Sequence, residues 1–210
     1  MRSDAGRATS RLMLADWRRQ MATLYADVRR LSESDPAAAL EEWRRVRQRL
    51  YREHPQSPLP PDRRADFVAR HFPHDPALRF EVRVILDEEK EEGDASDSAG
   101  IGLRPFGWVT VPFPAGTRRL SLFWMEEYAG GLFLSFRDGT NGAETYGGGR
   151  YLLDGAKSAD LGGDAARGTL ILDFNFAYHP SCAFDPSWAC PLAPRENWLD
   201  IAIRAGERLG

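Results

Sequence analysis

Residues 78–87 read LRFEVRVILD, and this stretch decides the fold class. Within it, Phe80, Val82, Val84 and Leu86 alternate with the charged residues Arg79, Glu81, Arg83 and Asp87. Because successive side chains of a strand point to opposite faces, this period of two places the two sets on different faces. The stretch therefore predicts a half-buried strand.

Downstream of this strand, the sequence holds a series of short apolar runs. Each run is separated from the next by Gly, Pro or Asp, and the runs cover residues 108–113, 120–124, 132–136, 150–153, 170–176 and 199–203. Many short strands between turn residues are typical of an antiparallel barrel or sandwich. The acidic, Ser/Gly-rich segment 87–100 between the first two strands is predicted to be a mobile hairpin loop.

Upstream, the apolar period changes from two residues to three or four. Apolar residues at the spacing of one helix face are Leu14, Trp17, Met21, Leu24, Val28 and Leu31, and then Leu40, Trp43, Val46 and Leu50. They predict helices over about 11–31 and from Pro36 to near Pro55, with Asp35 as the N-cap of the second. The short connection between them favours an antiparallel pair. Asp62 is expected to cap a further short helix that reaches Phe67.

Together these patterns predict an α+β protein in which an N-terminal helical hairpin packs on an antiparallel β-barrel or sandwich. Residues 1–76 form the helical segment, and residues 77–210 form the β domain that carries the candidate site. The two parts are expected to make one structural unit.

Composition and charge narrow the class of protein. Of the 210 residues, 42% are apolar and 28% are charged, as in ordinary globular proteins, and the net charge is −3. A weakly acidic chain gives no electrostatic reason to expect nucleic acid or an anionic membrane as a partner. No apolar run has the length of a signal peptide core or a membrane span, so we expect a soluble cytoplasmic protein. The sequence leaves its oligomeric state open.

The block Phe136–Asn197 gathers the polar residues that could carry chemistry. His179 could act as a general base near neutral pH, with Asp173 or Glu196 as its orienting acid. Asp173 and Asn175 share one face of the predicted strand 170–176, where a pocket could use both. Arg150 follows three glycines, and its guanidinium could hold a carboxylate or phosphate. The alternative for Arg150 is an internal ion pair with Asp138 or Asp173.

The leading functional hypothesis is a polar pocket for a small-molecule ligand. Its lining would comprise Arg150, Asp173, Asn175, Tyr178, His179 and Glu196. In an enzymatic version, Arg150 anchors an anionic or carbonyl-bearing substrate while Asp173, His179 and Glu196 supply acid–base catalysis. Whether the protein is an enzyme stays open, and the sequence identifies no cofactor.

The alternative hypothesis is a metal-binding or structural module organised by His179, Cys182 and Cys190. These residues have the spacing His-x2-Cys-x7-Cys, which matches no standard zinc pattern, so we assign no metal ligand. A disulfide and two buried, unreactive thiols are the other interpretations of the cysteines. A third possibility is a protein-interaction module in which the N-terminal helices form a docking surface.

Three motifs in the block resemble a known family. They are F-R-D-x-T-x-G-x-x-T-Y-G-x-G-R-Y, D-F-N-x-A-Y-x-P-x-C and C-P-x-x-P-x-E-N. They resemble the bacterial and archaeal domain-of-unknown-function family sixteen-eighty-four, whose pattern usually has asparagine where this chain has His179. The resemblance implies no established activity, cofactor or substrate.

The resemblance does select residues for testing. These are Arg137, Asp138, Tyr146, Arg150, Tyr151, Asp173, Asn175, Tyr178, Cys182, Cys190, Glu196 and Asn197. On this basis Tyr146 and Arg137 join Arg150, Asn175 and Tyr178 as candidate ligand-binding residues.

Overall fold

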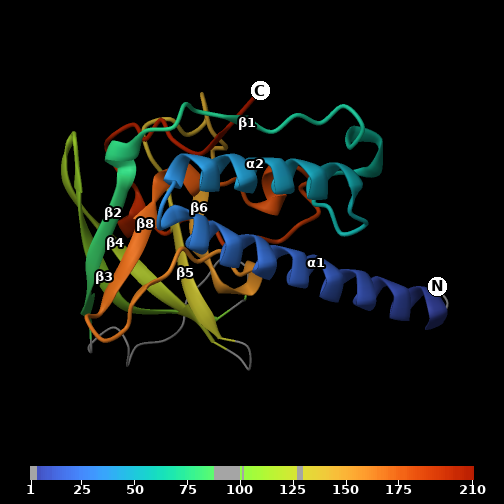
Figure 1. Ribbon diagram of the computed structural model, residues 1–210, viewed down its shortest axis with the longest axis horizontal. Helices are drawn as coiled ribbons and strands as arrows, with labels where there is room; N and C mark the ends of the chain where they lie inside the picture. The colour runs from blue at the N-terminus through green and yellow to red at the C-terminus, as the bar shows by residue number, and fades with distance from the viewer. Residues whose placement is uncertain (1–3, 88–99, 101, 127–129) are drawn as a thin grey trace.

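The computed structural model describes residues 4–87, 100, 102–126 and 130–210 (Figure 1). Most of the predicted loop 87–100 therefore lies outside the described residues. Within the described ranges, no helix is long and apolar enough to cross a membrane.

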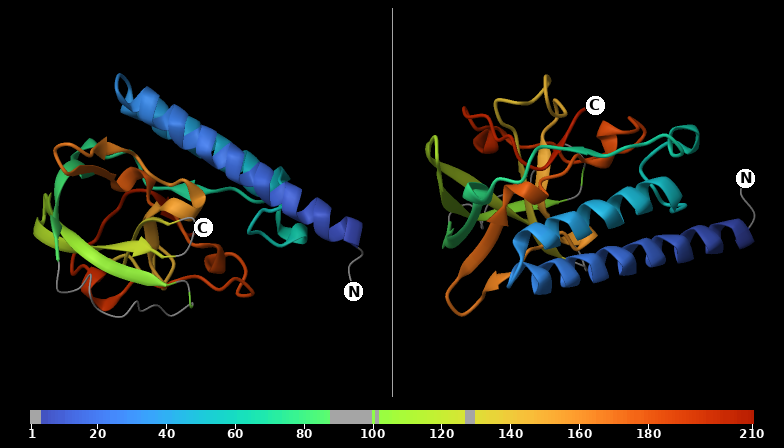
Figure 2. Two further views of the ribbon diagram at one scale, coloured as in Figure 1. Left: turned by 90° about the horizontal axis from the view of Figure 1, so that it is seen from below. Right: turned by 45° about the horizontal axis from the view of Figure 1, so that its top comes forward.

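The N-terminal helices form the predicted hairpin. Helix α1 spans Asp4–Ser32 and helix α2 spans Pro36–Glu53. The Asp35 carboxylate accepts a hydrogen bond from the Ala38 backbone N–H at 3.0 Å and so caps α2. The hairpin lies along one side of the sheet, and the N-terminal end of α1 extends beyond α2 (Figures 1 and 2). Its apolar face is buried, and Trp43 has no exposed surface.

The strands form one large antiparallel sheet and one small one, and the first strand of the small sheet lies within the segment 1–76. The strands are β1 (Arg70–His71), β2 (Arg79–Leu86), β3 (Leu103–Phe113), β4 (Gly116–Met125), β5 (Gly131–Phe136), β6 (Arg150–Asp154), β7 (Gly163–Asp164), β8 (Thr169–Asp173) and β9 (Glu207–Arg208). The large sheet has the order β6-β5-β4-β3-β2-β8-β7, and β1 pairs with β9. This arrangement confirms the predicted α+β class.

The large sheet curls into a half-barrel around an aromatic core. Inside it, the Phe174 ring lies 5.0 Å from that of Phe113 and 5.2 Å from that of Phe136. Tyr151 on β6 and Tyr178, which follows β8, exchange backbone hydrogen bonds of 2.9 and 3.0 Å. Strand β6 is one edge of the large sheet, and β8 lies near the other edge. The two hydrogen bonds therefore connect opposite sides of the half-barrel across its open side.

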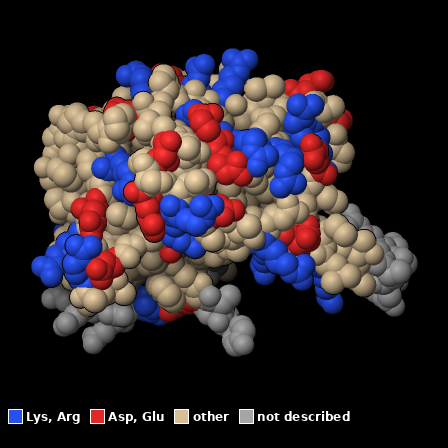
Figure 3. Space-filling model, viewed as in Figure 1, with Lys and Arg blue, Asp and Glu red and all other residues tan. Residues whose placement is uncertain are grey.

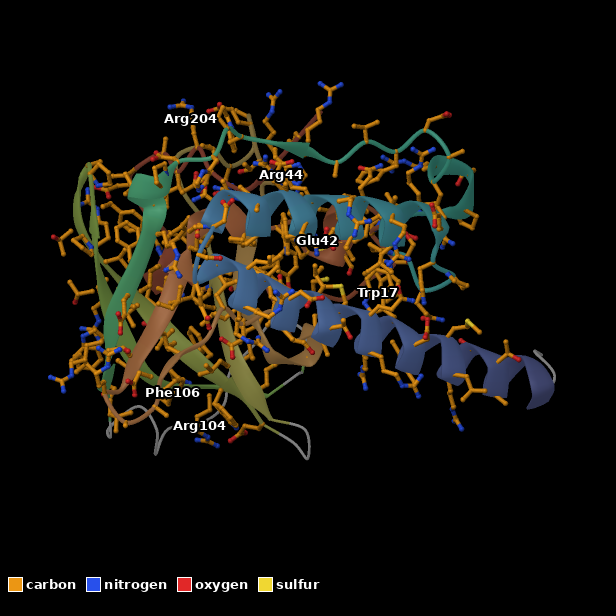
Figure 4. The ribbon with its side chains drawn as sticks, viewed as in Figure 1. Trp17, Glu42, Arg44, Arg104, Phe106 and Arg204 are labelled. Carbon is orange, nitrogen blue, oxygen red and sulfur yellow. The ribbon has the colours of Figure 1, made fainter. Side chains whose placement is uncertain are left out.

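A second apolar core lies between the half-barrel and the helices. Phe176 contacts Trp43 of α2 with a ring separation of 5.5 Å. Arg44 on the same helix donates to the Phe72 carbonyl oxygen at 2.8 Å, and Figure 4 shows how Arg44 lies on α2. Phe72 N–H in turn donates to the Gly206 carbonyl at 2.9 Å. The helices, the segment after β1 and the C-terminal segment are thereby held together.

Three predicted elements differ from the structure: two are shorter than predicted, and one is not a strand. The strand predicted over 170–176 ends at Asp173, because the Asp173 carboxylate caps the 3-10 helix η4 (Phe174–Phe176). The segment 199–203 is not a strand; it is held by hydrogen bonds such as that from Leu199 N–H to the Arg137 carbonyl, 2.8 Å. The helix near Asp62 is only the 3-10 helix η1 (Pro61–Arg63) and does not reach Phe67.

Candidate functional site

A hollow of about 560 Å³ lies between the segment 62–70, the 3-10 helix η5 (Ser181–Ala183) and the C-terminal residues 207–210. Its volume falls within the usual range of ligand pockets. Two buried titratable residues, His179 and Glu207, are part of its lining. The other lining residues are the charged Asp62, Arg63, Asp66, Arg70 and Arg208, the apolar Phe67, Val68, Ala69, Ala183, Phe184 and Leu209, and Gly210.

The hydrogen bonds of His179 define its tautomer. Its Nε2 accepts a hydrogen bond from the Tyr146 backbone N–H at 3.3 Å, so the neutral ring carries its proton on Nδ1. Nδ1 lies 3.9 Å from Glu207 Oε2, which is too far for a direct hydrogen bond. Burial lowers the pKa of His179 to about 4, although the Glu207 charge acts in the opposite direction. The ring is therefore neutral at pH 7.

Glu207 is held as a carboxylate by a buried network. Its Oε1 accepts from Arg47 Nη2 at 2.6 Å, and its Oε2 accepts from the His179 backbone N–H at 2.8 Å. Arg47 lies 4.5 to 4.8 Å from the rings of Trp43, Tyr51 and Tyr178. Burial tends to raise the pKa of Glu207, but the positive charge of Arg47, helped by the hydrogen bond from the His179 N–H, outweighs burial and lowers the pKa.

Arg150 forms the internal ion pair that was one of its two interpretations. Its Nη2 donates to Asp138 Oδ2 at 2.6 Å, and neither side chain has exposed surface. The same guanidinium donates to the backbone carbonyls of Ile203, at 2.8 Å, and of Ala205 and Glu207. Arg150 therefore holds the C-terminal segment against β6. It is not part of the lining of the hollow.

Asp173 and Asn175 are also joined to protein groups. Asp173 Oδ1 accepts from both the backbone N–H and the Nδ2 of Asn175, at 3.0 and 2.8 Å. The Asn175 side chain then exchanges two hydrogen bonds with the backbone of Asp75, at 2.8 and 2.9 Å. Asp173 lines a separate hollow of about 260 Å³ with Arg29 and Arg79. The structure thus does not bring Asp173 and His179 to one site.

The remaining candidate residues are dispersed. Glu196 is exposed on the 3-10 helix η6 (Arg195–Asn197), and Arg137 lies 4.1 Å above the Trp198 ring. Tyr178 is buried and its hydroxyl donates to Asp154 at 3.0 Å. Tyr146 is half-buried and reaches His179 only through its backbone N–H.

Asn197, another residue of the resemblance, bridges two strands. Phe123 of β4 pairs with Phe133 of β5. If the antiparallel pairing continued, Ser121, two residues before Phe123, would lie opposite Ser135, two residues after Phe133. The Asn197 side chain lies there instead. Its Oδ1 accepts from Ser121 N–H at 2.7 Å, and its Nδ2 donates to both serine carbonyls at 2.9 Å. Asn197 therefore replaces the missing strand pairing.

The two cysteines are free thiols that lie close together. Cys182 N–H is 3.4 Å from Cys190 Sγ. Over the part of the chain that the structure describes, no three His, Cys, Asp or Glu residues converge in a way that could hold a metal ion.

Sequence reasoning missed Arg47, Arg70, Glu207 and Arg208. Glu207 stands in the short polar stretch AGERLG, which carries no apolar period or motif. Its role comes from long-range contacts, since Arg47 precedes it by 160 residues. Pairing of β1 with β9 likewise brings Arg70 opposite Arg208.

Fold and site define the class: an α+β protein with a helical hairpin on a curled antiparallel sheet and a hollow beside a buried His–Glu pair. The chain belongs to the family described as "Protein of unknown function (DUF1684)", whose model matches residues 68–208. It is similar to the solution NMR structure of an uncharacterized protein from Haloarcula marismortui. The two are 34% identical with a TM-score of 0.59, over 82% of this chain and 93% of that one. A comparison with curated proteins finds no match.

Proposed function

We propose that the hollow beside His179 and Glu207 binds a small organic molecule that carries an anionic group, such as a carboxylate. The observation that carries the proposal is the pairing of Arg70 with Arg208 across β1 and β9, where both side chains line the hollow. Residues directly opposite each other in antiparallel strands lie close together, and like charges at such positions repel. An anion between the two guanidiniums would remove this repulsion.

The two arginines are available for a ligand. Both are exposed, and neither has an ion-pair partner among the described residues. This sets them apart from Arg47 and Arg150, whose guanidiniums are paired with buried carboxylates. Arginine suits this role because its planar group binds carboxylate or phosphate oxygens through two hydrogen bonds.

The other lining residues suit the body of an organic ligand. Phe67 and Phe184 lie edge to face with a ring separation of 5.8 Å. Val68 is 66% exposed. Covering these groups would remove apolar surface from water. His179 Nδ1–H, which makes no hydrogen bond within the described residues, is a donor for a ligand oxygen.

The proposal is binding, without catalysis. His179 Nε2 already accepts a hydrogen bond from the Tyr146 N–H. The Glu207 carboxylate already accepts hydrogen bonds from Arg47 and from the His179 backbone N–H. The other two acid–base candidates, Asp173 and Glu196, do not line this hollow. The proposal therefore assigns no pair of acid and base beside the place where a ligand would lie.

A thermal-shift screen tests the proposal. The library would contain small aromatic and aliphatic carboxylates, each with its neutral primary amide as a matched compound. We expect some carboxylates to raise the melting temperature of the protein and their amides not to do so. Arg70→Glu should abolish the effect, whereas Arg52→Glu, at an exposed position on α2, makes the same charge change and should preserve it. Equal stabilisation by acids and amides, or an unchanged effect in Arg70→Glu, would contradict the proposal.

A further inference from the structure

The two cysteines lie close to each other, and Cys182 directly precedes Ala183 and Phe184 in the wall of the same hollow. Cys182 lies on η5, and Cys190 follows after a loop of seven residues. The Cys182 backbone N–H donates a hydrogen bond to the Cys190 sulfur, with 3.4 Å between the nitrogen and the sulfur. Both residues are half-buried, so each keeps part of its surface open to solvent.

We propose that Cys182 and Cys190 are a site of reversible modification, at which a low-molecular-weight disulfide oxidises the two thiols to an intramolecular disulfide. In the first step one thiol loses its proton, and its sulfur attacks the reagent RSSR to give a mixed disulfide and one RSH. In the second step the other cysteine loses its proton and attacks the mixed disulfide, so that the protein disulfide forms and a second RSH leaves. Two thiols are oxidised, and one RSSR is reduced to two RSH.

The surroundings of the thiols predict how this reaction proceeds. Burial and the neighbouring Cys190 thiol raise the pKa of Cys182, so little thiolate is present at neutral pH. Exchange begins from the thiolate, and the reaction should therefore become faster as the pH rises. The Cys190 sulfur lies beside the Cys182 backbone, so the second step is intramolecular and is favoured over accumulation of the mixed disulfide.

Oxidation should also change the wall of the hollow. Ala183 and Phe184, directly after Cys182, are part of its lining, and Phe184 contacts Tyr51 and His179 with ring separations of 5.3 and 6.3 Å. A bond between the sulfurs would constrain η5 at its middle residue. This consequence depends on the position of η5 alone and holds whether or not a ligand binds in the hollow.

Intact-mass spectrometry of the full chain, incubated with glutathione disulfide, tests the modification. We expect a loss of about two mass units and no stable glutathione adduct, and dithiothreitol should restore the original mass. Cys182→Ser and Cys190→Ser should each accumulate the adduct instead, because the second step has lost its nucleophile. A wild-type protein that keeps its mass, or accumulates the adduct as the variants do, would overturn the proposal.

An NMR spectrum tests the structural consequence. Backbone amide signals of Ala183, Phe184 and His179 should shift between the reduced and oxidised forms, while those of Ala166 and Arg167 in the turn before β8 should not. If the disulfide forms and the three signals do not move, the link between the thiol pair and the hollow is refuted.

Discussion

Replacement of Asp138 by asparagine tests the internal role of Arg150. The variant keeps the size of the side chain but removes the charge that faces the guanidinium at 2.6 Å. At an effective dielectric constant of about 20, two unit charges at this distance attract each other by about 6 kcal/mol. Loss of one partner of a buried pair typically destabilises a protein by about 3–5 kcal/mol, because the other charge stays buried without compensation.

We therefore expect Asp138→Asn to lower the free energy of unfolding by about 3–5 kcal/mol. Urea denaturation followed by tryptophan fluorescence would measure this loss. With a slope of about 2–3 kcal/mol per molar urea, the midpoint should fall by roughly 1–2 M.

Asp200→Asn is the matched control. Asp200 pairs with Arg118, but its side chain is 76% exposed, so the loss of its charge should leave the midpoint nearly unchanged. A midpoint of Asp138→Asn that falls no further than that of Asp200→Asn would refute the structural role of the buried pair.

Three other substitutions are expected to have separate effects. The folded-state pKa of His179 is about 4, against an ordinary value of 6.5. The unfolded chain therefore binds more protons between these values, and stability should fall by about 3 kcal/mol as the pH drops from 6.5 to 4. His179→Asn should remove this part of the pH dependence in denaturation curves. Asn197→Ala should lower the free energy of unfolding by roughly 2–4 kcal/mol, since three buried backbone groups lose their partner. Gly206→Ala should lower the melting temperature, because Gly206 has φ 77° and an added Cβ would lie 2.4 Å from the Ala177 carbonyl oxygen.

Each of these expectations has a control or an outcome that would contradict it. A pH profile of His179→Asn that stays as steep as that of the wild type would contradict the role of His179. Asn141→Ala removes a half-buried asparagine with two hydrogen bonds, and should destabilise less than Asn197→Ala. Gly168 has φ 63° but nothing within 4 Å of an added Cβ, so Gly168→Ala isolates the backbone strain. A melting temperature equally low in both glycine variants would show that the contact with Ala177 is unimportant.

The fold could be predicted where the sequence pattern is local. The alternation of apolar and charged residues after Leu78 correctly predicts β2, and the apolar spacing around Trp43 correctly predicts the buried face of α2. The prediction was wrong where a side-chain hydrogen bond changes the direction of the backbone. Residues 174–176 continue the apolar run of β8, but Asp173 caps a 3-10 helix there, and no period in the sequence records that hydrogen bond.

The candidate site could be predicted only in part. His179 was recognisable because histidine is rare in this chain and titrates near neutral pH. Its partner Glu207 was not, because a glutamate near the C-terminus acquires its role only when Arg47 of α2 and the backbone of His179 pack against it. Many of the polar residues crowded into the block 136–197 stabilise the fold through internal contacts. Examples are the Asp138–Arg150 ion pair and the hydrogen bonds by which Asn197 bridges two strands.

Mapping of a bound carboxylate by amide chemical shifts would test the proposed binding hollow most directly. Uniformly ¹⁵N-labelled protein would be titrated with the best stabilising acid from the thermal-shift screen and, separately, with its neutral amide. We expect the acid to shift signals of residues 67–70, 183–184 and 207–209, which line the hollow, and the amide to leave them in place. Shifts confined to other parts of the molecule, such as the smaller hollow beside Asp173, would show that the ligand binds elsewhere and that the assignment of this hollow is wrong.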